Sequence, residues 1–253
     1  MYLNDVHLLY YVLASILGLF IGEFVSWMNK RLPEYKKVFT KEFFLEEKMN
    51  FKPNYILMIL TSIIYVALIY KFGIQKTFIA NLNLIKYMIL TPMLLSAFVI
   101  DYRLQIIPNR LNLTIFELGL TTAFIYGISD VAIMIKMFQG MLVGGGIFLL
   151  ITLIGGLIMG KEAMGFGDVK LMIGLGLIFG TESTVVITLF SFLIGAILSI
   201  ILLAFKIKKT DEYIPFGPFI VISVFLSIFI PFETLKEILM QIFTLGMFNK
   251  NQL

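Results

Sequence analysis

Long runs of apolar residues constrain this chain more than any other feature of its sequence. Several approach or exceed the roughly 18 residues that read as a membrane-spanning helix. Only 14% of the 253 residues are charged, whereas a soluble domain carries about 25%. The sequence therefore predicts an all-α, polytopic membrane protein. We expect about eight spans, over residues 6–29, 55–72, 85–101, 112–128, 139–160, 169–181, 184–205 and 214–231. The sixth is too short to cross an average bilayer straight, so we expect it to be tilted or shielded by its neighbours.

The basic residues are divided unequally between the two ends of these spans. One side carries 14 of the 20 basic residues, and the other side carries six. Because cytoplasmic loops are enriched in Lys and Arg, we expect the richer side, which includes Arg103, Arg110 and Lys170, to face the cytoplasm. Both chain ends would then lie outside, and Asp101 and Asp168 would face the cytoplasm.

Three regions follow from this pattern. Residues 1–53 combine the first span with a short cytoplasmic loop, residues 54–231 form a transmembrane core, and residues 232–253 contain an apolar helical pattern that predicts an interfacial helix. Asp5 stands where a signal peptide would be positive, so we expect the first span to be retained. Within the loop, residues 41–48 form either a surface amphipathic helix or a solvated connection.

Two aspartates at the ends of apolar segments are the leading candidates for chemistry. Asp101 ends one span, and Asp168 closes the sequence Gly165-Phe166-Gly167-Asp168, where the glycines permit a sharp turn and a close approach by another segment. Carboxylates at membrane depth are costly and therefore indicate function. Two neighbouring carboxyl groups do not both ionise easily, so one can hold a proton while the other polarises a water molecule. This pattern predicts an aspartyl protease at the membrane surface.

Metal chemistry has little support in this composition. The chain has no cysteine and a single histidine, His7, so a cysteine zinc site and a disulfide are both excluded. A lone histidine at the start of a span indicates an interfacial position. We expect no metal and no nucleic-acid partner, because the positive charges lie in loops between spans.

Three separated motifs resemble the type IV prepilin peptidases, a family of aspartyl proteases. Residues 160–171 are similar to the family's second-aspartate segment, and Ile100-Asp101 with Ile107-Pro108-Asn109 and Leu111 is similar to its first. Ile214-Pro-Phe-Gly-Pro-Phe219 resembles its signature near the last span. The resemblance implies that Asp101 and Asp168 are the catalytic pair. It also implies cleavage of the basic leader of a prepilin or pseudopilin after a glycine, in the bacterial inner membrane.

The N-terminal part resembles the family less closely. Residues 22–33 fit the short motif that ends in Arg31-Leu32-Pro33, but the following loop is short and lacks the cysteine pairs that hold zinc in many bacterial members. Proteolysis is expected to need no cofactor. The resemblance leaves open a second activity, N-methylation of the mature product with S-adenosylmethionine as the methyl donor. The oligomeric state is not predicted.

Four further charged residues are candidates for contact with substrate or cofactor. Glu23 and Glu117 lie inside spans, where a charged carboxylate costs about 2.5 kcal/mol or more, so we expect both to face the bundle interior. Each is a ligand contact or a structural carboxylate. Lys170, two residues after Asp168, adds positive charge beside it or marks the interface. Glu162, with Asp211 and Glu212, could attract a basic leader.

Two other functions remain open on the sequence. A presenilin-like intramembrane protease also uses a GxGD aspartate, but its first aspartate would lie within a span, and it would carry a Pro-Ala-Leu motif. A transporter with broken helices and buried carboxylates would be expected to show two similar halves. In this sequence Asp101 ends its span, and neither a Pro-Ala-Leu motif nor a pair of similar halves is found.

Overall fold

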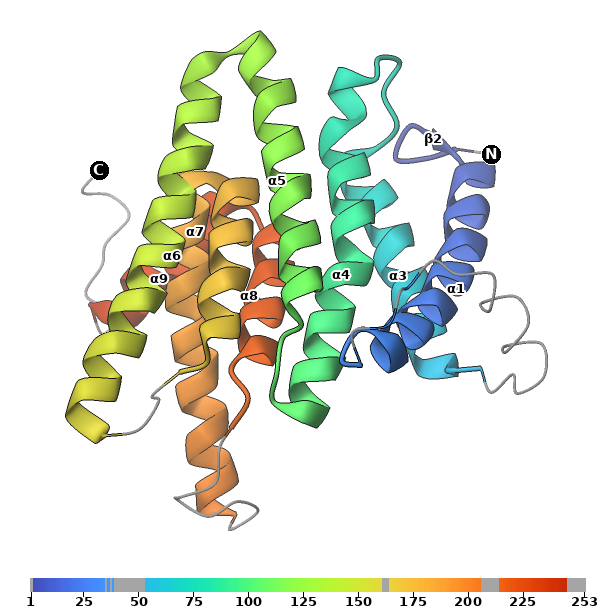
Figure 1. Cartoon of the computed structure of the whole chain (residues 1–253). Coiled ribbons are helices and arrows are strands. Elements are labelled where there is room, and N and C mark those ends of the chain that lie inside the picture. The colour runs from blue at the N-terminus through green and yellow to red at the C-terminus, as the bar shows by residue number, and fades with distance from the viewer. Residues whose placement is uncertain are drawn as a thin grey trace.

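A computed structural model describes residues 2–34, 36, 38, 53–160, 164–205 and 214–244 of the chain. Two short strands form an N-terminal hairpin, which the sequence did not predict, and the remaining elements are helical (Figure 1). The elements are β1 (Tyr2–Leu3), β2 (Val6–His7), α1 (Leu8–Arg31), α3 (Tyr55–Phe72), the 3-10 turn η1 (Ile79–Asn81), α4 (Leu82–Leu104), α5 (Asn109–Ser129), α6 (Val131–Met159), α7 (Phe166–Ala204), α8 (Gly217–Phe229) and α9 (Phe232–Phe243).

The predicted all-α, multi-pass membrane fold is confirmed, and two of the expected spans are joined in one element. Six helices of the described chain are long and apolar enough to cross a bilayer, and α8, at 13 residues, is a shorter apolar helix. The expected spans 169–181 and 184–205 both lie within α7, which has 39 residues and non-helical backbone angles at Gly180. We refer to residues 166–179 and 181–204 as its first and second arms.

The two arms of α7 fold back on each other at Gly180. A Cβ placed on Gly144 of α6 would lie 2.7 Å from the Met172 oxygen and 2.9 Å from Thr184 Cγ2. In a straight helix these two residues would be about 18 Å apart, so only a reversal brings both to one point. Gly180 has φ +74°, which glycine adopts without strain.

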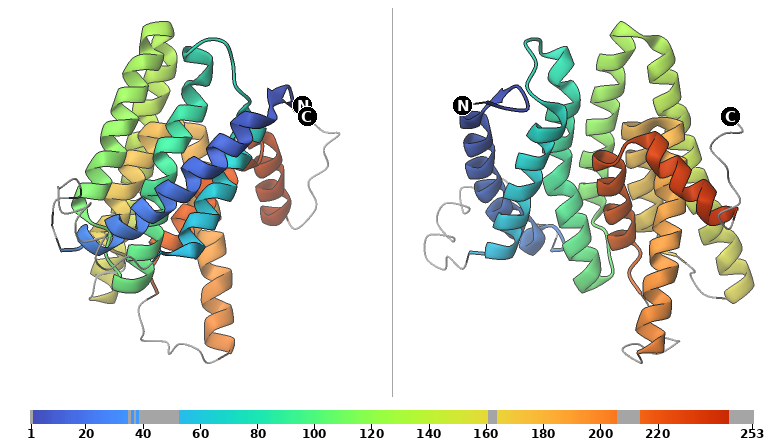
Figure 2. Two further views of the ribbon diagram at one scale, coloured as in Figure 1. Left: turned by 90° about the vertical axis from the view of Figure 1, so that its right-hand side faces the viewer. Right: turned by 180° about the vertical axis from the view of Figure 1, so that it is seen from behind.

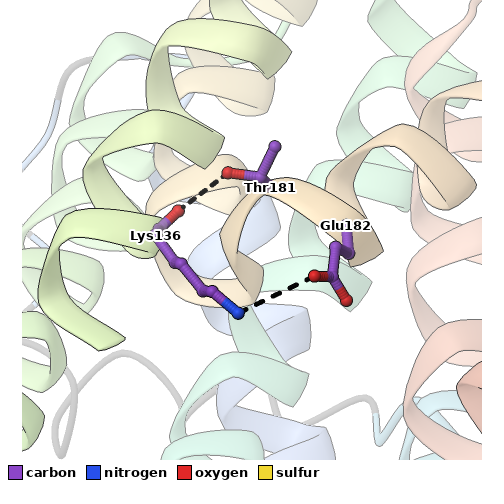
Figure 3. Close-up of polar contacts among 3 residues, drawn as sticks. All are labelled: Lys136, Thr181 and Glu182. Atoms are coloured by element: carbon purple, nitrogen blue, oxygen red, sulfur yellow. Dashed lines mark hydrogen bonds and ion pairs between the residues drawn. The ribbon is translucent and has the colours of Figure 1, made fainter. Parts of the chain in front are cut away.

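Side chains just after the reversal tie α7 to α6. The Thr181 hydroxyl donates to the Lys136 carbonyl oxygen at 3.1 Å, and Lys136 Nζ lies 3.8 Å from Glu182 Oε1 (Figure 3). Both charged side chains are largely exposed. The ion pair therefore contributes little, and the hydroxyl bond is the more specific link.

Glycines set the closest helix contacts, as small residues do in membrane bundles. Gly140 of α6 and Gly176 of the first arm of α7 face each other, and a Cβ on Gly176 would collide with the Gly140 carbonyl. On the other side of the molecule, Gly18 and Gly22 of α1 approach the backbone of α3. The first arm of α7, which carries Asp168, is thereby held against α6.

The start of α6 differs from expectation. The helix α6 begins at Val131 rather than at residue 139, and the Asp130 carboxylate caps it by accepting from the Ala132 N–H at 2.8 Å. A helix does follow Pro231: α9 packs Leu235 and Leu239 against the second arm of α7, and Figure 2 shows it crossing the back of the molecule. The expected amphipathic segment 41–48 lies outside the described residues.

Candidate active site

Asp101 occupies the last turn of α4, where its carboxyl group is turned into the protein. Its side chain is only 3% exposed. The Gly217 N–H, at the start of α8, donates to Asp101 Oδ2 at 2.9 Å. A segment 116 residues away in sequence therefore holds this carboxyl group in place.

Asp168 lies in the first turn of α7, directly after the glycine-flanked Phe166. Gly165 is the N-cap, and its carbonyl oxygen accepts from the Asp168 N–H at 3.0 Å. The Asp168 side chain is also 3% exposed, and its Oδ1 is buried without a hydrogen-bond partner. Asp168 lies close enough to Asp101 for the two carboxyl groups to interact electrostatically. The structure thus brings the two predicted aspartates together.

The second glycine of the Gly165-Phe166-Gly167 turn lets the chain pass close to the segment after α4. A Cβ on Gly167 would lie 3.2 Å from Ile107 Cβ. The Asn112 side chain, 4% exposed, donates to the Gly167 carbonyl oxygen at 3.1 Å, and its own Oδ1 is buried without a partner. Asn112 therefore anchors the Asp168 turn to α5, a role that sequence reasoning missed. By contrast, Phe166 is half exposed.

The start of α8 is fixed by a cluster of aromatic rings. Phe216 packs against Phe148, Phe192 and Phe219, with ring centroids 5.9, 5.0 and 5.8 Å apart. The resemblance marked this segment as a motif without assigning it a contact. The structure brings its Gly217 against Asp101, and only a tertiary fold could reveal that pairing.

The other candidate residues make contacts with residues other than the two aspartates, or lie at the surface. Glu23 is buried as expected, and its Oε2 accepts from the Asn54 N–H at 2.9 Å, which links α1 to the start of α3. Glu117 was expected to face the bundle interior, and that prediction is wrong: its side chain is exposed. Lys170 Nζ donates to Asn109 Oδ1 at 2.8 Å. Glu162 lies outside the described residues.

Two cavities lie near the α4 side of the site. An apolar cavity of about 490 Å³ runs between α1, α3, α4 and α5, and its lining includes Met28, Pro92 and Leu111. A smaller pocket of about 200 Å³ is lined partly by Asn29, Asn54 and Arg103. Within the described ranges, no group of three or more His, Asp or Glu side chains could hold a metal ion.

Comparisons with known proteins find similarity to one family. A sequence model of the type IV leader peptidase family matches residues 88–200, which include both aspartates. The chain is 35% identical over 138 residues to a Pseudomonas aeruginosa protein named prepilin leader peptidase/N-methyltransferase, covering 54% of this chain and 46% of that protein. For a Xanthomonas campestris protein of the same name the identity is 31% over 167 residues, covering 65% and 54%. For one from Escherichia coli it is 30% over 129 residues, covering 51% and 56%.

The chain spans about half the length of the curated relatives that it matches. No solved structure matches it. The family match runs from α4 to the second arm of α7. Residues 88–200 are therefore similar to the type IV leader peptidase family.

Proposed function

We propose that this chain is a membrane aspartyl endopeptidase that removes the basic leader of a type IV prepilin or pseudopilin. One observation carries the proposal: α4 and α7 bring two buried carboxyl groups, Asp101 and Asp168, to the same end of the bundle. The similar proteins are named prepilin leader peptidase/N-methyltransferase, which supports this substrate class.

The chemistry needs one ionised and one protonated aspartate. The ionised carboxylate takes a proton from a water molecule as the water oxygen bonds to the scissile carbonyl carbon. The other aspartate gives its proton to the carbonyl oxygen, which stabilises the charge that develops there. The tetrahedral intermediate then returns the hydroxyl proton to a carboxylate, the C–N bond breaks, and the leaving amine takes a proton from the pair. No cofactor enters these steps.

The membrane face is part of the proposal. Arg103 and Lys170 lie at the bundle end that holds the aspartates, the side with the greater share of basic residues. The positive-inside rule therefore favours a cytoplasmic site in the bacterial inner membrane. There the leader would remain in the cytoplasm, and the apolar helix that follows the cleavage site would stay in the bilayer. Such substrates feed a pilus, a secretion system or a related assembly.

The functional regions follow from the same reasoning. We assign residues 54–231 to the peptidase core, residues 1–53 to an N-terminal span with its loop, and residues 232–253 to an interfacial segment. The family match lies wholly within the core. No nucleic-acid partner belongs to this function.

N-methylation is a second candidate activity, supported by the names of the relatives. Among the described residues, the pocket with Asn29, Lys30 and Arg103 offers polar groups for the charged amino-acid end of S-adenosylmethionine. The Asn29 amide atoms are buried without hydrogen-bond partners. The pocket volume of about 200 Å³ is below the ~300 Å³ at which small-molecule sites usually begin. It therefore fits only part of the methyl donor.

Two alternatives predict different behaviour. A presenilin-like protease would cut within the apolar helix of its substrate, and a transporter would not cut at all. Asp101 lies in the last turn of α4 rather than in mid-span, which favours cleavage at the membrane boundary.

The experiment is cleavage of a prepilin-like peptide, with a basic leader, a glycine and an apolar helix, by the purified chain in detergent. Mass spectrometry should show one cut, directly after the glycine, that is lost when a bulky residue replaces this glycine. A cut within the apolar helix would favour the presenilin-like alternative, and no cut would contradict the proposal. A mass gain of one methyl group that requires S-adenosylmethionine would establish the second activity.

A further inference from the structure

We propose that Gly217 is a positioning residue that makes Asp101 the ionised partner and leaves Asp168 as the proton donor. The inference rests on the proposed peptidase function. It adds a role for the start of α8, and it assigns the ionised state to one aspartate and the proton-donor role to the other.

At the start of α8, the Gly217 N–H is the one donor that is not used within the helix, and it donates to Asp101. The first N–H groups of a helix have no partner within the helix. Here Pro218 has no N–H, and the Phe219 and Ile220 N–H groups donate to the Phe216 carbonyl oxygen at 3.0 and 3.3 Å. The remaining donor, Gly217, bonds to Asp101 Oδ2 at 2.9 Å in a buried setting. A donor aimed at a carboxylate stabilises its charged form, and the positive end of the α8 dipole acts in the same direction.

Asp168 also accepts a backbone hydrogen bond from Gly165, but its Oδ1 has no donor. That atom is buried without a hydrogen-bond partner, and a buried charge without a partner is costly. Asp168 does lie in the first turn of α7, whose dipole favours a negative charge. Each aspartate thus has one backbone donor and one helix N-terminus beside it. The unpartnered Oδ1 of Asp168 therefore decides the balance, because a charge there would be the more costly one, and it favours the charge on Asp101. A proton on Asp168 then removes the cost of a second buried charge and supplies an O–H that can donate to the substrate.

The contact requires glycine and a fixed helix start. A Cβ at residue 217 would lie 2.7 Å from Asp101 Oδ2 and 3.1 Å from its Cγ. The rings of Phe216 and Phe219 pack close to Gly195, where an added Cβ would lie 3.2 and 2.9 Å from them. This packing on the second arm of α7 opposes any retreat of α8, so a side chain at residue 217 must displace the carboxyl group.

Carbon-13 NMR of the intact chain tests the assignment without any substrate. The sequence has only five aspartates, so labelling their side-chain carboxyl carbons gives five resonances, and the chemical shift of each reports whether that group is ionised. Spectra of Asp101→Asn and Asp168→Asn identify the two that matter. At neutral pH, we expect the parent to show Asp101 ionised and Asp168 protonated. Any other pattern overturns the inference.

Kinetics of Gly217→Ala provide the second test. We expect kcat to fall about tenfold or more, equivalent to ~1.4 kcal/mol or more in the barrier, with KM changed less than about twofold because substrate binding does not need the Asp101 contact. The control is Gly146→Ala in α6, where a Cβ has nothing within 4 Å; it should keep the parental kcat. An active parent with an equally active Gly217→Ala would overturn the inference alone. A parent that cuts no prepilin would overturn the proposed function, and the NMR pattern would still decide where the charge lies.

Discussion

The contact between Gly140 and Gly176 predicts a measurable loss of stability in Gly176→Ala. This glycine lies in the first arm of α7, eight residues after Asp168. A Cβ there would collide with the Gly140 carbonyl oxygen and lie 2.7 Å from the carbonyl carbon and 3.0 Å from Met141 Cα. These are backbone atoms, which cannot rotate away as a side chain can. The two helices must therefore separate.

The magnitude follows from two opposing contributions. Overpacking a tight contact costs about 1–3 kcal/mol, and replacing glycine by alanine within a helix returns about 0.5–1 kcal/mol. The two ranges combine to a net loss of about 0–2.5 kcal/mol, centred on ~1.3 kcal/mol, equivalent to a fall in Tm of up to about 10 °C for a domain of this size. At Gly146 there is no clash, so Gly146→Ala should raise Tm by about 1–4 °C.

Thermal unfolding of the purified variants in one detergent measures both effects. The double variant Gly140→Ala/Gly176→Ala should lose less stability than the sum of the single variants, because one separation of α6 from α7 relieves both clashes. Equal Tm values for Gly176→Ala and Gly146→Ala would refute the close approach of α6 and α7. Full additivity would refute the shared contact.

Two further predictions concern residues outside the aspartate pair. Asn112→Ala should lower kcat about tenfold and Tm by about 3–6 °C, because the Asp168 turn loses roughly one hydrogen bond, ~1.4 kcal/mol, to the Gly167 carbonyl. Asn112→Asp should behave similarly in the same peptide assay, and parental rates in both variants would contradict this role. Glu23→Ala should reduce the free energy of unfolding by about 1–3 kcal/mol, because the part-buried Asn54 N–H loses its acceptor. Exposed Glu117→Ala should change it by less than about 0.5 kcal/mol. Denaturant titration compares the two variants, and equal losses would count against the Glu23 link.

The sequence predicted the parts of the fold that depend on apolar runs and on punctuation by glycine and proline. The bounds of α3 were predicted residue for residue, and the short sixth span proved to be the first arm of α7, whose residues from Leu171 to Ile178 are mostly buried by neighbours. The start of α6 was placed too late because Lys136 interrupts the apolar run. Its side chain reaches outward, so the helix continues through it.

The wrong prediction for Glu117 has a geometric cause. The cost of a charge in a membrane argues for an interior position, but the direction of a side chain is set by the helical period. Ile115 and Gly119 of α5 are buried, and a residue midway between them, about 200° further around the helix, points away from that face. The buried periodicity of α5 therefore outweighed the charge argument.

The two aspartates could be chosen from the sequence because carboxylates are rare in such apolar surroundings. The contacts that support these aspartates could not be predicted from the sequence. The bonds from Gly217 to Asp101 and from Asn112 to Gly167 join segments 116 and 55 residues apart, and no local pattern specifies which backbone groups will meet. The motif around Gly217 was visible as a string, and its role as a hydrogen-bond donor came only from the packing of α8 against α4.

The most direct measurement of the central claim is the residual cleavage rate of Asp101→Asn, Asp168→Asn and the double variant on one prepilin-like peptide. Asp130→Asn is a matched control, since Asp130 caps α6 at the opposite end of the bundle. If the two aspartates act as one unit, each single variant should lose about as much activity as the double variant, roughly 10²-fold or more, while Asp130→Asn keeps the parental rate. Substantial cleavage by either single variant, or a double variant far slower than both, would contradict a catalytic pair formed by Asp101 and Asp168.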